Sequence, residues 1–555
     1  MGSTPSDLKT GAGNKPALSV RNLTVNLPAG MERGHAVENI SFDLMPGQIL
    51  CIIGESGSGK SVTANAVMGL LPRLMRVSGG SILLDDEDLL TCSDDAMRDM
   101  RGRVVSMIFQ DPLSALNPLM TVGAQVTEVM MAHGVGTPET RRSRAIELLD
   151  EVGLPDPGLM YHQYPFRLSG GQRQRVMIAI ALALEPKILI ADEPTTALDV
   201  TTQAQILRLI RDIQRRKGMS VMFITHDFGV VAEIADSVVV MEKGHIVEQG
   251  RADSVLNTPS HPYTKRLIAA VPRLTGKDRT TPEASDDAPI LSVEALMKTY
   301  RSGSKLFRTQ REVRAVREVS FTLPRGRTLG VVGESGSGKS SLGRLLVKLM
   351  ESDAGQILFE GQDIAGLDEK TFRNLRPKIQ MIFQDPFASL NPRRPAGELV
   401  AQGPMLHGTP KREALARAAE LFRLVGLDPS AMTRLPHEFS GGQRQRIGLA
   451  RALAMQPTVL VADEPVSALD VSVQEQVLRL LRDLRTRLSL SIVFITHDLR
   501  VAAELCDRIA VMHEGRIVEH GPTAEVFAAP RHDYTRTLMD SIPGRAWTPP
   551  VFVPT

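Results

Sequence analysis

Cysteine is scarce in this chain. Cys51, Cys92 and Cys506 are the only cysteines among 555 residues, and they form no CxxC pair or Cys/His cluster. This spacing excludes a disulfide framework and the ligand patterns of zinc or iron–sulfur sites. Three isolated thiols fit a reducing compartment such as the cytosol.

Aromatic side chains and excess charge are also lacking. Aromatic residues make up 4% of the chain, and the formal net charge is +2. Few aromatics argue against a protein that stacks bases along single strands. A near-neutral chain argues against a protein that coats DNA. We therefore expect no nucleic-acid partner.

Long apolar runs are missing as well. The longest, Val176–Leu184, has nine residues, whereas a helix that crosses a bilayer needs about 20. The first residues do not show the basic-then-apolar order of a signal peptide. If this protein works at a membrane, we expect other chains to do the spanning.

The sequence contains a long internal repeat. GESGSGKS at 54–61 returns 279 residues later, and MIFQDP at 107–112 returns after 274. SGGQRQR, ADEP, FITHD and H-x-Y-T each return after 271 residues. A repeat of this length predicts a duplicated domain rather than a solenoid. The predicted parts are a tail (1–16), a first domain (17–272), a polar linker (273–289), a second domain (290–543) and a tail (544–555).

Short apolar runs in each half predict buried strands. They end in Gly-rich turns at 48–53 and 328–332, and in polar residues at 187–191, 221–225, 458–462 and 492–496. Such runs, separated by helical stretches, favour an α/β fold with a parallel sheet covered on both faces. Helices are expected to begin at Lys60 and Lys339, and a helical insert is expected before each SGGQ.

GESGSGKS fits the phosphate-binding loop G-x-x-x-x-G-K-S. Its glycines let backbone N–H groups wrap a phosphate, and the following helix adds its positive end. Lys60 and Lys339 should reach the β- and γ-phosphates, and Ser61 and Ser340 should ligate Mg²⁺. Two identical copies argue against a chance Gly/Ser loop.

Paired carboxylates follow two of the predicted strands. Asp192 and Asp463 suit the Mg²⁺ shell, and Glu193 and Glu464 suit a general base that activates water. The alternative is a solvated acidic turn, which the upstream phosphate loops disfavour.

The remaining motifs are weaker when taken singly. Each SGGQ has the pattern of a helix N-cap, whose free N–H groups also suit an anion, and the sequence leaves open whose phosphate would bind. Gln110, Gln384, His226 and His497 alone carry little weight, because a lone His after a strand is more often structural.

Taken in order, the phosphate loop, Gln, SGGQ, ADE, ALD and His resemble the ATPase subunits of ABC transporters. The resemblance implies, in each half, a RecA-like P-loop NTPase core with an antiparallel β subdomain and a helical subdomain. It implies two ATP and Mg²⁺ sites, each pairing the phosphate loop of one half with the SGGQ of the other. It assigns Mg²⁺ contacts to Ser61, Gln110, Asp192, Ser340, Gln384 and Asp463, and catalysis to Glu193, Glu464, His226 and His497. The ATP contacts implied are Gly54, Glu55, Ser56, Gly57, Ser58, Gly59, Lys60, Ser61, Gly333, Glu334, Ser335, Gly336, Ser337, Gly338, Lys339, Ser340, Tyr300, Ser169, Gly170, Gly171, Gln172, Ser440, Gly441, Gly442 and Gln443.

Within that family, the sequence most resembles tandem ATPases of the peptide and nickel importer group. FQDPLSALNP, FQDPFASLNP, SGGQRQR and the HPYT and HDYT tails are typical of that group. This resemblance implies a peripheral ATPase on the cytoplasmic face of the bacterial inner membrane. Its partners would be two integral-membrane permeases and, through them, a solute-binding protein. The resemblance favours di- and oligopeptides, including glutathione, as the transported solutes. Nickel chelates and opine-like solutes are the alternatives.

Alternative functions fit the sequence less well. Soluble tandem ABC ATPases that act on ribosomes usually join their halves by a long charged helix, and the linker here is short and polar. ABC ATPases of DNA repair would need zinc cysteines or a long coiled coil, for which the space between Gln110 and Ser169 is too short.

One departure distinguishes the two halves. The family usually stacks an aromatic on adenine, which Tyr300 fits in the second half, whereas Leu27 occupies the aligned position in the first. The first site should therefore hold adenine less tightly. Both catalytic glutamates are present, so we expect two competent sites.

Overall fold

The computed structural model describes residues 15–28, 30–31, 33–196, 198–274, 288–302, 311–385, 389–467 and 469–552. These divide into two compact units. The described residues of 1–196, 205–269 and 550–555 form one unit, and those of 197–204 and 270–549 form the other. Most of the first predicted tail and of the predicted linker lies outside the described residues, whereas residues 544–552 of the second tail are described. The predicted domain boundaries stay predictions.

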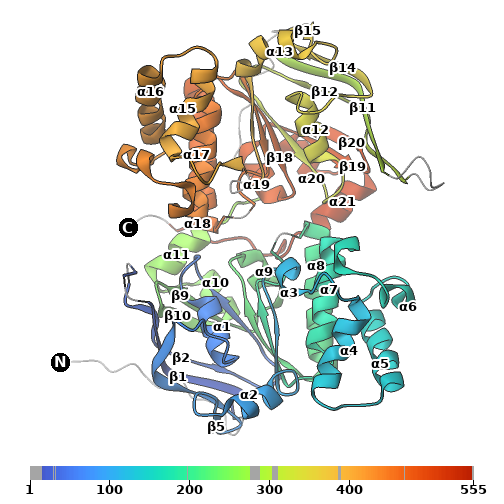
Figure 1. Cartoon of the computed structure of the whole chain (residues 1–555), viewed down its shortest axis with the longest axis vertical. Coiled ribbons are helices and arrows are strands. Elements are labelled where there is room, and N and C mark those ends of the chain that lie inside the picture. Colours follow the sequence, from blue (N-terminus) through green and yellow to red (C-terminus); the bar gives the residue numbers. More distant parts are fainter. Residues whose placement is uncertain are drawn as a thin grey trace. The chain divides into compact units, whose positions relative to one another are not determined.

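Each repeat builds two sheets and a set of helices (Figure 1). The strands of the first repeat are β1 (Leu18–Asn26), β2 (His35–Leu44), β3 (Ile49–Ile53), β4 (Arg76–Leu84), β5 (Glu87–Asp88), β6 (Val105–Ile108), β7 (Ile188–Asp192), β8 (Ser220–Ile224), β9 (Ser237–Glu242) and β10 (His245–Arg251). Its α-helices are α1 (Lys60–Val67), α2 (Asp94–Met100), α3 (Pro112–Ala115), α4 (Val122–Ala132), α5 (Pro138–Glu151), α6 (Pro157–Met160), α7 (Gly170–Ala181), α8 (Val200–Lys217), α9 (Phe228–Ile234), α10 (Ala252–Asn257) and α11 (Pro262–Ala269).

The second repeat follows the same order. Its strands are β11 (Leu291–Ser302), β12 (Arg311–Leu323), β13 (Thr328–Val332), β14 (Ala354–Phe359), β15 (Gln362–Asp363), β16 (Ile379–Ile382), β17 (Val459–Asp463), β18 (Ser491–Thr496), β19 (Arg508–His513) and β20 (Arg516–Pro522). Its α-helices are α12 (Lys339–Leu346), α13 (Glu369–Leu375), α15 (Ala396–Leu406), α16 (Lys411–Leu424), α17 (Gly441–Leu453), α18 (Val471–Leu488), α19 (Leu499–Leu505), α20 (Thr523–Ala528) and α21 (Asp533–Asp540).

The larger sheet of each repeat is mostly parallel, as predicted. Its order is β10-β9-β3-β8-β7-β6 in the first repeat, and β20-β19-β13-β18-β17-β16 in the second. Only the edge pairs β9–β10 and β19–β20 are antiparallel. Every residue of β3, β7, β8, β13, β17 and β18 is buried, because helices and the smaller sheet cover the faces of the larger sheet.

The smaller sheet and the helical insert complete each repeat. The antiparallel order β2-β1-β4-β5 recurs as β12-β11-β14-β15. The insert packs α4, α5 and α7 together in the first repeat, and α15, α16 and α17 in the second (Figure 1). Both subdomains implied by the resemblance are therefore present.

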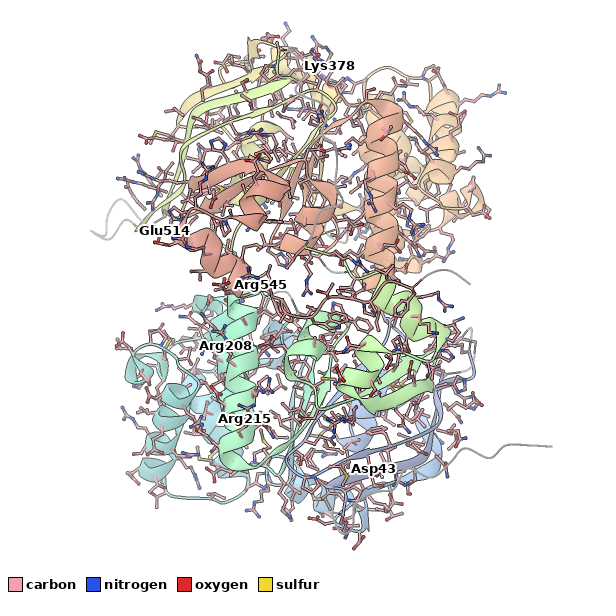
Figure 2. The ribbon with its side chains drawn as sticks, turned by 180° about the vertical axis from the view of Figure 1, so that it is seen from behind. Asp43, Arg208, Arg215, Lys378, Glu514 and Arg545 are labelled. Carbon is pink, nitrogen blue, oxygen red and sulfur yellow. The ribbon has the colours of Figure 1, made fainter. Side chains whose placement is uncertain are left out.

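Helix α8 shows how sequence pattern determines burial. Ile206, Ile210 and Ile213 recur at helical spacing and are buried. Figure 2 shows Arg208 and Arg215 along the same helix, and both are exposed. The helix therefore has one apolar and one charged face.

A glycine in β4 is required where β1 bulges. The β1–β4 register shifts between Arg21 and Thr24. Gly80 lies opposite with φ +96°, and a Cβ there would lie 2.5 Å from the carbonyl oxygen of Arg21. Gly355, with φ +91°, meets Ala295 in the same way in the second repeat. The neighbouring Gly79 has open space around it.

We predict that Gly80→Ala lowers the melting temperature of the chain by roughly 5 °C. An alanine in the left-handed region costs about 1–2 kcal/mol, and its Cβ would also overlap the backbone of β1. In a unit of this size, such a loss of stability lowers the melting temperature by a few degrees. Differential scanning calorimetry measures the shift. Gly79→Ala is the matched control and should change stability by less than about 0.5 kcal/mol. Equal shifts for the two variants would contradict the assignment.

Candidate functional site

The phosphate loops connect β3 to α1 and β13 to α12. Gly54 has φ +152°, and a Cβ there would overlap the carbonyl oxygen of Met241 on β9. Gly333 meets the carbonyl oxygen of Met512 in the same way. Gly59, with φ +107°, precedes α1 in the left-handed region. The glycine positions of the motif are thus required by the backbone path.

Each loop lysine is held by the carbonyl oxygens of its own loop. Lys60 Nζ donates to Gly54 O at 2.7 Å and to Glu55 O at 2.9 Å. Lys339 Nζ donates to Gly333 O and Glu334 O, both at 2.7 Å. Burial lowers the pKa of the Lys339 ammonium from its ordinary value, against the opposing effect of nearby carboxylates. Both ammonium groups therefore lie inside the cradle where the sequence predicts phosphate.

The predicted Mg²⁺ ligands meet in both units. Ser61 Oγ donates to Asp192 Oδ1 at 3.0 Å, and Ser340 Oγ to Asp463 Oδ1 at 3.1 Å. Burial raises the pKa of Asp192 to about 6, although the Ser61 hydrogen bond opposes this. Hydroxyl and carboxylate oxygens are hard ligands, and Mg²⁺ is commonly held by one or two carboxylates plus substrate phosphates. The residues present therefore fit a Mg²⁺ ion.

The predicted general base of the first unit has three polar partners. Glu193 Oε2 accepts from Gln110 Nε2 at 3.1 Å and Thr196 Oγ1 at 3.0 Å, and lies 3.3 Å from His226 Nδ1. Burial acts to raise the pKa of Glu193, but the hydrogen bond and charge of His226, helped by Lys60, lower it to about 2. This carboxylate is therefore kept ionised and able to accept a proton.

The second unit repeats this arrangement with one difference. Glu464 accepts from Gln384 Nε2 at 2.9 Å and lies 3.2 Å from His497 Nδ1. Burial again opposes the shift, but His497 lowers the pKa of Glu464. Ser467, aligned with Thr196, donates to the backbone oxygen of Glu464 at 3.2 Å instead of its carboxylate. In both units the glutamine amide donates a hydrogen bond to the glutamate carboxylate. The predicted contact of this glutamine with Mg²⁺ stays a prediction.

Each SGGQ begins a helix, as its N-cap pattern predicted. Ser169 Oγ accepts from Gln172 N at 3.3 Å, and Gln172 Oε1 accepts from Ser169 N at 3.0 Å. Ser440 and Gln443 form the same capping box. The role of each SGGQ toward the phosphate of the other half stays a prediction. In the two ALD segments, Ala197 and Ala468 lie outside the described residues.

Tyr300 lies beside the helix that follows the second phosphate loop. Its hydroxyl is 3.2 Å from Ser341 Oγ and within 3.3 Å of Met350 Sδ, and its side chain is 39% exposed. The exposed ring is free to stack on a base. In the first repeat Leu27 and Val62 occupy the corresponding positions.

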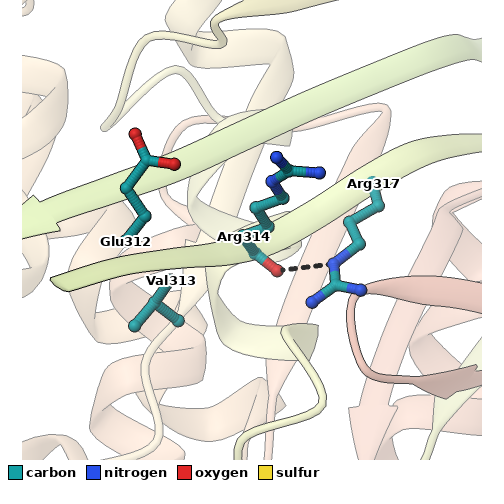
Figure 3. A pocket seen from close by; sticks show the side chains of 4 residues that line it. All are labelled: Glu312, Val313, Arg314 and Arg317. Carbon is teal, nitrogen blue, oxygen red and sulfur yellow. Dashed lines mark hydrogen bonds between the residues drawn. The ribbon is translucent and has the colours of Figure 1, made fainter.

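A shallow pocket adjoins the second phosphate loop on β12 (Figure 3). It has a volume of about 470 Å³ and is lined by Glu312, Val313, Arg314 and Arg317. Arg317 Nε donates to the Arg314 carbonyl oxygen at 3.3 Å. Between these residues in sequence, the carbonyl oxygen of Ala315 lies where it would overlap a Cβ on Gly338. Two guanidinium groups and one carboxylate give this border of the loop a net positive charge, which favours the binding of anions.

Side chains without a predicted site role also hydrogen-bond to the loops. Arg33 Nη2 donates to Gly57 O at 2.6 Å in the first loop. The hydroxyls of Tyr263 and Tyr534 accept from Glu55 N and Glu334 N. The repeated H-x-Y-T was a signal for the tyrosines, whereas no pattern pointed to Arg33.

Comparisons with known proteins agree with this geometry. The family described as ABC transporter matches residues 37–196 and 316–467. The family described as oligopeptide/dipeptide transporter, C-terminal region, matches 247–308 and 518–546. The chain therefore belongs to the ABC transporter family of ATP-binding proteins, and it is an ATPase. Within the described residues, no helix has the length and hydropathy needed to cross a membrane.

Named relatives are similar over nearly the whole chain. The peptidoglycan transport ATP-binding protein YejF of Agrobacterium fabrum is 47% identical over 95% of this chain and 96% of its own. The glutathione import ATP-binding protein GsiA of Escherichia coli K12 is 47% identical over 96% of this chain and 90% of its own. A solved dimeric ATP-binding cassette, MJ0796 bound to ADP and Pi, aligns with 42% of this chain and 98% of its own, at 27% identity and a TM-score of 0.39.

We predict that Tyr300→Leu weakens ATP binding at the second site by about two- to tenfold, because aromatic stacking contributes roughly 0.5–1.5 kcal/mol. The affinity of the second site for ATP is measured by titration in a chain that carries Lys60→Ala, which removes the lysine of the first loop. Tyr300→Phe is the control, because it keeps the ring and loses only the hydroxyl. Equal weakening by the two substitutions would refute stacking.

Proposed function

We propose that this chain is the ATP-hydrolysing motor of an ABC importer for peptide-like solutes, such as di- and oligopeptides or glutathione. It would bind two ATP between its halves and drive uptake through two permeases, on the cytoplasmic face of the bacterial inner membrane. The observation that carries the proposal is that both units hold a complete set of lysine, serine, aspartate, glutamate, glutamine and histidine. The peptide-transporter C-terminal region and the names of the relatives favour the cargo class.

The chemistry we assign to each half uses groups already in place. The loop N–H groups and Lys60 or Lys339 bind the phosphates, and Mg²⁺, held by serine and aspartate, would neutralise phosphate charge. Glu193 or Glu464 accepts the proton of the attacking water. The histidine contact stabilises the ionised form of this carboxylate, which is the form that can accept a proton.

The other half would complete each site. The capping boxes at Ser169 and Ser440 leave further N–H groups of the first helical turn directed outward from the helix end. A helix N-terminus of this kind favours an anion, so we assign it to the γ-phosphate held by the opposite loop. Nucleotide binding would thereby draw the halves together, and hydrolysis would release them.

An apolar groove supports the proposed permease contact. In the second unit it has a volume of about 290 Å³ and includes Leu349, Phe383 and Leu406. Leu349 is 53% exposed and Leu406 is 64% exposed. Phe383 directly precedes Gln384, whose amide holds Glu464. A permease segment in this groove would therefore press on the residue next to the catalytic network.

The first unit exposes matching apolar residues. Leu70 and Phe109 align with Leu349 and Phe383, and they are 41% and 43% exposed. Phe109 precedes Gln110 in the same way. Matching exposed apolar residues in both units fit a contact with two permease subunits.

We predict that Leu349→Glu with Leu406→Glu reduces recovery of co-expressed permeases by about tenfold. Hot-spot apolar contacts contribute more than about 1 kcal/mol each, and each 1.4 kcal/mol changes affinity tenfold. Affinity purification in detergent, with quantification of the permease chains, measures the loss. Leu488→Glu alters a similarly exposed leucine outside the groove, and it should recover permease normally. If all variants recover permease equally, the groove is not the contact.

The proposed hydrolysis of ATP at two sites is tested by substituting the glutamate of each site. Glu193→Gln and Glu464→Gln should each lower the turnover of ATP, and the two together should abolish it, because each removes one general base. Phosphate release by the purified chain with its permeases measures the rates. If one single variant kept full activity while the other lost all, the two-site proposal would fail. Stimulation by a peptide-loaded binding protein would separate an importer from a soluble ribosomal ATPase.

A further inference from the structure

A tyrosine from the C-terminal region of each repeat contacts the phosphate loop. Tyr263 Oη accepts a hydrogen bond from Glu55 N at 3.2 Å, and Tyr534 Oη from Glu334 N at 3.0 Å. The partners are 208 residues apart in the first repeat and 200 in the second. The contact is therefore kept although the two repeats differ in length between these points.

The rest of the H-x-Y-T motif positions this tyrosine. In the second repeat, His532 Nδ1 accepts from Tyr534 N at 3.1 Å at the start of α21. The carboxylate of Glu519, on β20, accepts from Arg531 N at 2.8 Å and His532 N at 3.1 Å. A chain of hydrogen bonds thus runs from the edge strand to the tyrosine.

The first repeat builds the same chain. His261 Nδ1 accepts from Tyr263 N at 3.3 Å. Glu248, on β10, accepts from Ser260 N at 2.6 Å and His261 N at 3.2 Å. The ring of Tyr263 is buried, with 3% exposed. The conserved geometry of two copies within one molecule indicates a specific role for the hydroxyl.

The tyrosine and the loop lysine hold the same loop residue from two sides. The N–H of Glu55 donates to Tyr263, and its carbonyl accepts from Lys60 Nζ at 2.9 Å. Glu334 is held likewise by Tyr534 and Lys339. A shift of this residue would move the carbonyl that orients the ammonium, and with it the loop N–H groups that follow.

We propose that Tyr263 and Tyr534 are positioning residues for nucleotide binding, through which the C-terminal region sets the geometry of the phosphate loop. The inference rests on the proposed binding of ATP by these loops. Since loop contacts to the phosphates exist both before and during hydrolysis, losing the hydroxyl raises the KM for ATP and leaves kcat nearly unchanged.

The test removes the hydroxyl and keeps the ring. In a full-length chain with Lys339→Ala, only the first site has its lysine, and Tyr263→Phe should weaken binding of fluorescent trinitrophenyl-ATP with Mg²⁺ by about two- to tenfold, the usual effect of one hydrogen bond. Tyr534→Phe in the same background is the matched control and should leave this binding unchanged. In the chain with both native lysines, Tyr263→Phe with Tyr534→Phe should raise KM by a similar factor, with kcat within about twofold.

Several results would overturn the proposal. Unchanged binding in Tyr263→Phe, equal weakening by Tyr263→Phe and Tyr534→Phe, or a fall in kcat at constant KM would each do so. If the two Phe substitutions lowered the melting temperature without changing nucleotide binding, the hydroxyls would have only a structural role. An unsubstituted chain that bound no nucleotide would refute the proposed function as well, whereas normal binding with unaffected Phe variants would refute the tyrosine role alone.

Discussion

The close approach of one backbone to another at the start of each phosphate loop constrains the whole site. The carbonyl of Met241 lies where Gly54 would carry a side chain, and Met512 does the same at Gly333. The approach occurs where β9 pairs in parallel with β3, which pairs in parallel with β8 and through it with β7. Strands β19 and β13 pair in the same way. The carboxyl ends of the neighbouring strands then lie at one edge of the sheet, where ligands of open α/β sheets bind. Asp192 at the end of β7 is placed beside the loop in this way.

Duplication has preserved this arrangement while its surroundings changed. The lysine cradle, the serine–aspartate pair and the glutamate with its histidine recur with nearly equal distances. The border of each loop differs: Arg33 reaches the first loop, whereas Glu312, its counterpart in the repeat, pairs with Arg301. The two units therefore share their predicted reacting groups and differ at the border of the loop, which favours the prediction of two active but unequal sites.

Local patterns were enough to predict much of this molecule. The buried strands, the helix starts at both lysines and the serine N-caps depend on neighbours in sequence, and all are confirmed. Contacts between distant segments were predicted only where motifs and the family resemblance put residues into one site, as for Ser61 and Asp192. No period or spacing indicates that Gln110 donates to Glu193, or that Tyr263 reaches a residue 208 positions earlier. Those contacts depend on the order of the strands in the sheet, and this order cannot be predicted from a single sequence.

Two competent nucleotide sites in one chain are tested most directly by counting bound ATP. A chain with Glu193→Gln and Glu464→Gln should bind ATP and fail to hydrolyse it, because both general bases are gone and both cradles remain. Equilibrium dialysis of this full-length variant with radiolabelled ATP and Mg²⁺ should give two ATP per chain at saturation. Saturation at one ATP, or at none, would contradict two competent sites.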